Sequence, residues 1–384
     1  MTSLNNKLLW EKTRLDEVAK LDCQSIHPSD ILDQTAYLGL EHLNGEGGIN
    51  LAETVASADL KSNKYKFSRH HILYGKLRPY LRKISRPDFE GICSTDIIPI
   101  LPGEKISRNY LFHFLRTPLM VQLATNQSSG ANLPRLNPKR LASFHIPLPP
   151  LSEQKRIAGI LDKADALRVK RRESLSLLDN LIQSTFLDIF GDPVMNPMGW
   201  DVHALENLGN VQTGGTPPSK FEGMFDGGIP FVTPGDLTEK WVVSARTVTE
   251  AGAKKSKTVN KGATFVCCIG ATIGKMGKAS THSAFNQQIN AVSWRDAVVD
   301  DFGLEAMKFF KSKIIKDGAS TTLPILKKSL FQKICIPVPP LSLQRRFAAI
   351  VESIEKQKAR LKAHLAELDN LFASLQQRAF NGEL

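Results

Sequence analysis

The side chains best suited to binding chemistry are Lys, Arg and Tyr residues grouped between Lys64 and Arg86. This run, KYKFSRHHILYGKLRPYLRKISR, holds eight Lys or Arg residues and no Asp or Glu. Cationic side chains suit phosphate contacts, and side chains on a β element can reach base edges. The run therefore predicts a DNA contact through Lys64, Lys66, Arg69, Tyr74, Lys76, Arg78, Tyr80 and Arg82. A solvated basic edge strand is the alternative interpretation.

A second basic region lies between Ala251 and Arg295, where no acidic residue occurs. The Gly-rich loop that precedes it would let backbone amides approach a phosphate. Residues 286–290 are expected to form a strand, whose amide side chains can pair with adenine. For each residue taken singly, capping a turn or pairing inside the domain is as good an interpretation of the amide as a contact with DNA. A polar loop follows each of the two regions, at 128–132 and at 318–322. The further candidates for DNA binding are Asn132, Thr213, Gly214, Gly215, Thr216, Lys254, Lys255, Lys275, Gln287, Gln288, Asn290 and Thr321.

Motifs that resemble catalytic sites fail on spacing. Gly270 to Lys275 has three residues between its glycines, where a P-loop has four, and Met276 follows the lysine. His70-His71 lacks the helical spacing and the Glu of a zinc protease. The chain shows no methyltransferase motif and no arrangement of Ser, His and Asp that context supports. We therefore expect no catalytic residue and no metal site.

Composition limits the class of protein. The net charge is +12, which favours a polyanion partner such as nucleic acid. The five cysteines lack metal-ligand spacing and indicate a reduced, cytoplasmic environment. No apolar stretch reaches the ~18 residues of a membrane helix, and the N-terminus lacks a secretory pattern.

The elements that position these candidates come from an internal repeat. Residues 146–190 match residues 336–380 at a constant offset of 190, and Trp10 falls on Trp200 at the same offset. A long period indicates two similar halves. The expected domains are 1–145 and 200–335, each followed by a long helix, at 146–190 and 336–384, with a Pro- and Gly-rich linker at 191–199. Inside the domains, 72–80 is expected to be a strand, turn and strand, 96–101 a core strand and 110–123 a helix.

Each repeated segment follows a Pro-Pro stop, where Ser152 and Ser342 are expected as N-caps. It is rich in helix-favouring residues, with apolar side chains at three-four spacing. The spacing predicts a coiled-coil seam with a polar centre. Antiparallel packing with pseudo-twofold symmetry would place the two domains at opposite ends. The seam residues are expected to be Ile160, Leu167, Leu178, Leu181, Ile350, Leu361, Leu368 and Leu371.

The doubled segment IPLPPLSEQKRIAGILD and IPVPPLSLQRRFAAIVE, each closing a variable block, resembles the specificity subunit of Type I restriction-modification systems. The Thr-Gly-Gly-Thr-Pro loop and the Asn-Gln-Gln segment also fit that family. The resemblance covers nearly the whole chain, and Leu343 in place of Glu153 is a small departure. It implies an α+β fold of two target-recognition domains, each a mixed β-sheet with helices, and two conserved helices in an antiparallel coiled coil.

The same resemblance implies a function. Each recognition domain would read one half of a bipartite, asymmetric site in double-stranded DNA, and the coiled coil would set the unread spacer. Two modification subunits with methyltransferase activity and the restriction subunits would dock on the helices. S-adenosylmethionine, ATP and Mg would bind those partners, so this chain would hold no cofactor.

Two other classes of function stay open from the residues alone. One is the recognition portion of a self-contained restriction-methylation enzyme. The other is a scaffold that joins two binding modules through a coiled coil without binding DNA. Salt-insensitive behaviour on a heparin or DNA column would favour this second class.

Overall fold

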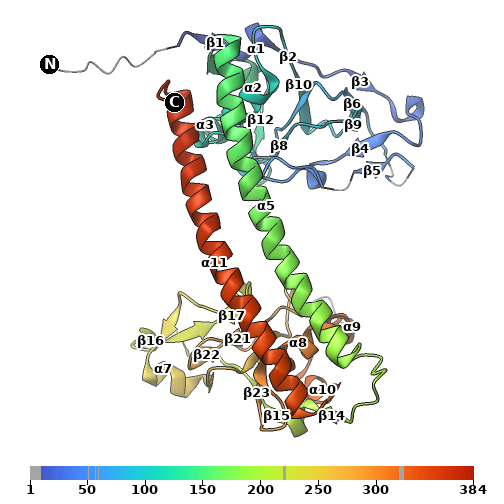
Figure 1. The fold of residues 1–384 in the computed structure, drawn as a ribbon, viewed down its shortest axis with the longest axis vertical. Coiled ribbons are helices and arrows are strands. Elements are labelled where there is room, and N and C mark those ends of the chain that lie inside the picture. Colours follow the sequence, from blue (N-terminus) through green and yellow to red (C-terminus); the bar gives the residue numbers. More distant parts are fainter. Residues whose placement is uncertain (1–9, 51, 57, 59, 219–221, 320–323) are drawn as a thin grey trace, which may run out of the picture. The chain divides into compact units, whose positions relative to one another are not determined.

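The computed structural model describes residues 10–50, 52–56, 58, 60–218, 222–319 and 324–384 (Figure 1). The chain forms two compact units. Unit 1 comprises residues 1–172 and 363–384, and unit 2 comprises residues 173–362. Each unit therefore holds one globular domain, the beginning of the helix that follows it and the end of the other long helix.

The domain of unit 1 contains two sheets. The first is antiparallel, in the order β2 (Ala19–Leu21), β10 (Ile97–Pro102), β7 (Ile72–Gly75) and β8 (Ile84–Ser85). The second has the order β3 (Ser25–Ile26), β6 (Lys64–Phe67), β9 (Gly91–Cys93), β4 (Ala36–Leu38) and β5 (Glu53–Thr54), with β4 and β9 parallel. The first sheet shares its core with α2 (Arg108–Leu115), α3 (Pro118–Asn126) and the start of the long helix.

The domain of unit 2 repeats this topology. Its first sheet has the order β15 (Gly209–Thr213), β23 (Ile289–Trp294), β20 (Thr264–Cys267), β21 (Met276–Ala279) and an added parallel strand, β17 (Trp241–Val242). Its second has the order β19 (Lys257–Val259), β22 (Ser283–Phe285), β16 (Phe225–Val232) and β18 (Thr247–Val248), again with one parallel pair, β16 and β22. Helices α8 (Asp300–Phe309) and α9 (Lys311–Gly318) correspond to α2 and α3.

The first and last strands of each domain pair in matching registers. Strand β1 (Lys12–Arg14) pairs with β13 (His145–Pro147), and β14 (Val202–Ala204) pairs with β24 (Cys335–Pro337). In both, the last strand ends at a proline and the helix begins four residues later. The two domains are therefore the same fold, although their sequences show little of this.

The two long helices are α5 (Leu151–Phe190) and α11 (Leu341–Phe380) (Figure 1). In unit 1 the beginning of α5 lies against the end of α11, because Arg156 donates a hydrogen bond to the Leu384 carbonyl and Arg168 pairs with Asp369. In unit 2 the end of α5 meets the beginning of α11, where Phe186 contacts Phe347. The helices are therefore antiparallel within each unit, as the repeat predicts.

The seam of the helix pair differs from the prediction at three of the eight predicted positions. Ile160, Leu178, Ile350, Leu361 and Leu368 are half-buried. Leu167, Leu181 and Leu371 are 55%, 46% and 50% exposed and do not belong to the seam. The next residue along faces inward in each case, namely Arg168, Ile182 and Phe372.

Arg168 explains why the apolar pattern is misleading there. Its guanidinium lies 4.4 Å from the ring centre of Phe372 and 2.6 Å from Asp369 Oδ1. A cation over an aromatic face and beside a carboxylate is stable at a half-buried position. An inward arginine thus displaces Leu167 to the solvent side.

Three local predictions are also corrected. The expected helix over 110–123 is two helices, α2 and α3, because Thr117 caps a new helix whose first residue is Pro118. Ser152 and Ser342 are the second residues of α5 and α11, so neither caps its helix. A 3-10 turn (Pro79–Leu81) separates β7 from the short β8, which begins only at Ile84. The core strand expected over 96–101 is confirmed as β10.

Candidate nucleic-acid interface

A buried glutamine fixes each domain to the start of its own helix. Gln154 donates from Nε2 to the carbonyl oxygens of Pro149 and Lys105, at 2.8 and 3.0 Å, and its Oε1 accepts the Ser107 amide at 2.7 Å. Ser107 directly precedes α2. The start of α5 is therefore joined to the start of α2 through one side chain.

Gln344 makes the same three bonds in unit 2. Its Nε2 donates to Pro339 and Ala297, at 2.8 and 3.1 Å, and its Oε1 accepts the Val299 amide at 2.8 Å. Both glutamines are fully buried. The glutamine of the repeated Pro-Pro-Leu-Ser-x-Gln motif is thus the residue that positions a domain on its helix.

Ion pairs add a second attachment, and the helix residues that form them also repeat at an offset of 190. In unit 1, Arg168 pairs with Asp165 and Asp369, both at 2.6 Å. Arg172 then reaches from α5 to Glu46 of the domain at 2.7 Å. The polar centre of the seam in this unit is therefore a set of paired charges.

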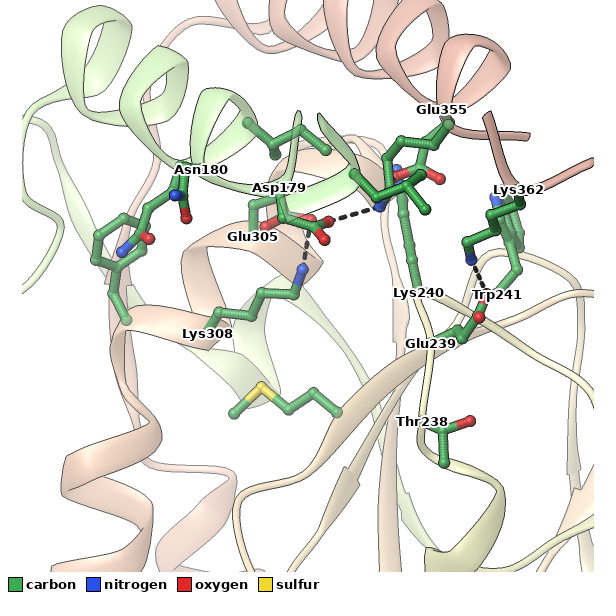
Figure 2. Close-up of a pocket in the computed structure, with 16 residues that line it drawn as sticks. Asp179, Asn180, Thr238, Glu239, Lys240, Trp241, Glu305, Lys308, Glu355 and Lys362 are labelled. Carbon is green, nitrogen blue, oxygen red and sulfur yellow. Dashed lines mark hydrogen bonds and ion pairs between the residues drawn. The ribbon is translucent and has the colours of Figure 1, made fainter. Parts of the chain in front are cut away.

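The corresponding residues of unit 2 line a cavity of about 570 Å³ (Figure 2). Lys358 pairs with Asp179 and Glu355, at 2.6 and 3.1 Å, and Lys362 pairs with Glu239 at 2.5 Å. Lys308 on its wall pairs with Glu305 (Figure 2). Because these lysines are neutralised by carboxylates, the cavity is a poor site for phosphate.

Several of the candidate residues of unit 1 lie where three segments converge. These segments are the β7–β8 connection (76–83), the β9–β10 turn (94–96) and the stretch 132–136, and together we call them loop cluster 1. The Arg78 amide donates to the Pro134 carbonyl, and the Lys76 amide donates to the Asp96 carbonyl. The Leu136 amide donates back to the Lys76 carbonyl at 2.9 Å.

The side chains of loop cluster 1 form a charged surface. Asp96 lies 3.1 Å from Arg135 and 3.9 Å from Lys76. The Arg78 guanidinium donates to the Asn132 carbonyl at 3.4 Å. Tyr80 and Arg82 are exposed at the tip of the connection. Five of the sequence candidates, Lys76, Arg78, Tyr80, Arg82 and Asn132, are thus brought together.

Unit 2 builds loop cluster 2 from 268–275, 286–288 and 324–326 with the same main-chain bonds. The Gly270 amide donates to Pro324 at 2.9 Å, the Cys268 amide to Gln288 at 2.8 Å, and the Leu326 amide to Cys268 at 2.8 Å. The two clusters therefore correspond at an offset of 192 in their first two segments and 190 in the third.

The side chains of the two clusters differ in charge. Lys76, Asp96 and Arg135 of the first cluster correspond to Cys268, Gln288 and Ile325 of the second. Gln287 is exposed, Lys275 is half-buried, and Gln288 accepts a hydrogen bond from the Asn286 side chain at 3.1 Å. One main-chain frame thus carries two chemically unlike surfaces.

The Gly-rich loop of unit 2 has a different role from the one expected. The amides of Gly214 and Gly215 donate to the carbonyls of Ile289 and Phe285, so they are not free to bind a phosphate. A Cβ on Gly214 would lie 2.2 Å from the Asn286 carbonyl oxygen. Thr216 donates to Gln287 Oε1, so the loop supports the 286–288 turn from behind.

Three other candidates are enclosed in their own domain. Tyr74 is buried in the core because β7 is covered on both faces. Lys64 is buried, with Nζ bonded to Ser62, and burial lowers its pKa. Asn290 is buried and accepts from Thr213 at 2.6 Å. These three side chains are not available to DNA in this conformation.

The remaining candidates are exposed but lie on other elements. Lys66 is on β6, beside a groove that also contains Asp30 and Glu90. Arg69 is in the β6–β7 connection. Lys254 and Lys255 end α7 (Glu250–Lys255). Thr321 lies outside the described residues. The Asn-Gln-Gln segment is a turn between β22 and β23, where a strand was expected.

Sequence reasoning missed Arg135 and Asp96, which complete loop cluster 1. Arg135 stands in the segment Leu133-Pro134-Arg135-Leu136, whose leucines and proline match the second half at the 190-residue offset. The repeat showed that this segment is shared by the two halves of the chain, but it did not indicate that the segment lies beside the basic run.

Comparison with known proteins identifies the family. The family model described as Type I restriction modification DNA specificity domain matches residues 7–176 and again 197–370. The chain belongs to this family. It contains two specificity domains, and the resemblance drawn from the repeated motif is confirmed.

Individual relatives agree with this assignment. Over 186 residues the chain is 31% identical to the Type I restriction enzyme EcoDI specificity subunit of Escherichia coli, covering 47% of this chain and 41% of that protein. It is 24% identical over 317 residues to the MjaIX specificity subunit of Methanocaldococcus jannaschii, covering 74% and 71%. The chain thus spans less than half the length of the first of these relatives.

A solved structure shows the same fold. It was determined in a study of complex assembly and conformational transition of the type I R-M system. It matches over 100% of both chains with a TM-score of 0.54 and 22% identity. Among the described residues of the present chain, no helix is long and apolar enough to cross a membrane.

Proposed function

We propose that the chain is the DNA-reading subunit of a Type I restriction-modification complex, and that each domain reads one half of a bipartite, asymmetric site through its loop cluster. The observation that carries this proposal is the pair of loop clusters, which share main-chain bonds and differ in side chains. Two loop clusters that have the same main-chain structure and different side chains suit two half-sites of different sequence.

The long helices would act as the spacer of the recognition site. A 40-residue helix is about 60 Å long, so antiparallel helices can set a distance of several base pairs. Inserting one heptad into both helices would add about 10 Å. We expect the unread spacer to lengthen by up to about three base pairs and both half-sites to stay unchanged.

Catalysis would belong to the partner subunits. Two modification subunits would dock on the helices and bind S-adenosylmethionine, and restriction subunits would bind ATP and Mg. The methylated base must leave the duplex stack, and this step would fall to the modification subunit.

The test is co-expression with a candidate modification subunit from a neighbouring gene, followed by single-molecule sequencing of the host DNA for N6-methyladenine. A split, asymmetric motif that disappears when this gene is deleted is the expected result. Replacing residues 1–145 or 200–335 with the corresponding domain of a relative should change one half of the motif only. Methylation that persists after the deletion would refute the proposal.

A further inference from the structure

We propose that Arg78 and Arg82 read guanine in the half-site of domain 1, and that the corresponding positions of domain 2 make no base contact through side chains. The inference rests on the proposed function and assigns a base and an atom-level role within it. It comes from comparing one loop in its two copies.

The loops 75–83 and 267–275 have the same main-chain structure. The Gly75 amide donates to the Lys83 carbonyl, and the Cys267 amide to the Lys275 carbonyl, both at 2.8 Å. Inside the loop, the Leu81 amide donates to Arg78, and the Ile273 amide to Gly270, at 2.9 and 3.0 Å. Arg78 therefore corresponds to Gly270, and Arg82 to Gly274.

All four of these positions require left-handed backbone. Gly270 and Gly274 have φ of 89° and 84°, and Arg78 and Arg82 both have φ of 51°. Glycine adopts this region freely, whereas a side chain with a Cβ raises the energy of the folded state there. Domain 2 carries the residue that the backbone favours, and domain 1 carries arginine at both positions.

The two arginines gain little inside their own domain. Arg78 makes one long hydrogen bond, at 3.4 Å, to the Asn132 carbonyl. Arg82 is exposed, and its side chain has no hydrogen bond or ion pair within the described structure. Burial lowers the pKa of Arg116 to about 10, and the charge of Arg82 adds to that lowering, so Arg82 is repelled by its neighbour. A guanidinium that lacks an internal partner, on a strained backbone, indicates a partner outside the domain.

The shape of the tip favours base reading. Tyr80 and Leu81, between the arginines, are 50% and 42% exposed, while Ile273, which corresponds to Leu81, is buried. A projecting tip can enter the major groove. A planar guanidinium then pairs bidentately with guanine O6 and N7. An exposed arginine can also contact a phosphate. Lysine can replace arginine in a phosphate contact, whereas it cannot replace the bidentate contact with guanine.

The experiment uses the complex co-expressed with its modification subunit. The variants are Arg78→Gly, Arg82→Gly, the double Gly variant, Arg82→Lys and a control, Arg140→Ala, an exposed arginine on α4 (Pro138–Ala142). The readouts are the thermal unfolding temperature and the methylated motif from single-molecule sequencing. The glycine variants should unfold at the same or a higher temperature, because glycine relieves the left-handed strain.

The motif should change in one place. We expect the double Gly variant to lose discrimination for guanine by roughly 5- to 150-fold at each contacted position of the first half-site, with the second half unchanged. Arg82→Lys should lose the same discrimination at one position, since lysine keeps the charge and lacks the fork. Arg140→Ala should leave the motif unchanged.

Three results would overturn the inference. An unchanged motif in the double Gly variant would exclude base reading, and the proposed function would stand. Full activity in Arg82→Lys, with uniform weakening of both halves in the Gly variants, would assign the arginines to phosphate. Absence of any split motif in the unsubstituted complex would refute the proposed function itself, and the inference with it.

Discussion

Replacing Gln154 or Gln344 with alanine should destabilise one unit of the protein at a time. Each side chain is fully buried and makes three hydrogen bonds, to one amide and two carbonyl groups. Truncation leaves these buried groups without a partner, and each such group costs about 1–3 kcal/mol. Allowing for partial hydration of the space left behind, we expect each variant to lose about 2–4 kcal/mol.

The assay is urea unfolding combined with amide hydrogen exchange. In Gln154→Ala the Ser107 amide should lose protection while the Val299 amide keeps it, and Gln344→Ala should show the reverse. Lys155→Ala and Arg345→Ala, at the exposed neighbouring positions, are the matched controls and should change stability by less than about 0.5 kcal/mol. Retained protection of Ser107 in Gln154→Ala, or losses no larger than in the controls, would refute the reasoning.

Three further predictions concern other positions of the two domains and their helices. Gly214→Ala places a Cβ 2.2 Å from the Asn286 carbonyl, so it should cost about 1–3 kcal/mol in urea unfolding, while Gly228→Ala, where the space is open, should cost less than about 1 kcal/mol. Phe186→Ala removes a buried ring packed on Phe190, Phe302 and Phe347 and should cost about 3–5 kcal/mol, against little change for the exposed Leu187→Ala. Burial lowers the pKa of His113 below its ordinary 6.5, although the bond to Asp162 opposes this shift. The stability that the neutral histidine contributes is therefore present above pH 6.5. It is lost as the pH falls through the lowered pKa. Unfolding measured from pH 8 to 5 should show this loss, and His113→Gln should flatten it; an equally steep profile in the variant would contradict the assignment.

The repeat, the helices and the polar seam could be predicted from the sequence because they depend on local pattern. Three of the eight predicted seam residues are exposed, and two of them, Leu167 and Leu371, were chosen because leucine is a typical seam residue. The inward positions belong to Arg168 and Phe372, which stabilise each other and reach Asp369. Such a contact joins residues about 200 positions apart, and no periodicity within one helix reveals it.

The strand-by-strand correspondence of the two domains could not be predicted, although the repeat indicates two similar halves and their helices match without a gap. The offset is 190 in the first and last strands and 192 in the first two segments of the loop clusters, so a comparison at one fixed offset misses the correspondence inside each domain. The segments of each loop cluster are held together by main-chain hydrogen bonds, which do not depend on residue type. Tyr74 was misassigned for a related reason: β7 is buried on both faces, so the alternation that would mark an exposed side is missing.

The construction of the loop clusters separates what holds the fold from what would read DNA. The segments of each cluster are joined by amide and carbonyl groups, and the one ion-pair group among them, Asp96 with Arg135 and Lys76, is partly exposed and worth little stability. Side chains at these positions can therefore change at small cost to the domain. If the clusters read the two half-sites, substitutions there should alter the recognised sequence and leave the unfolding free energy nearly constant, the opposite of what Gln154 and Gln344 would show. Measuring both quantities for both groups of variants tests whether recognition and folding use separate sets of contacts.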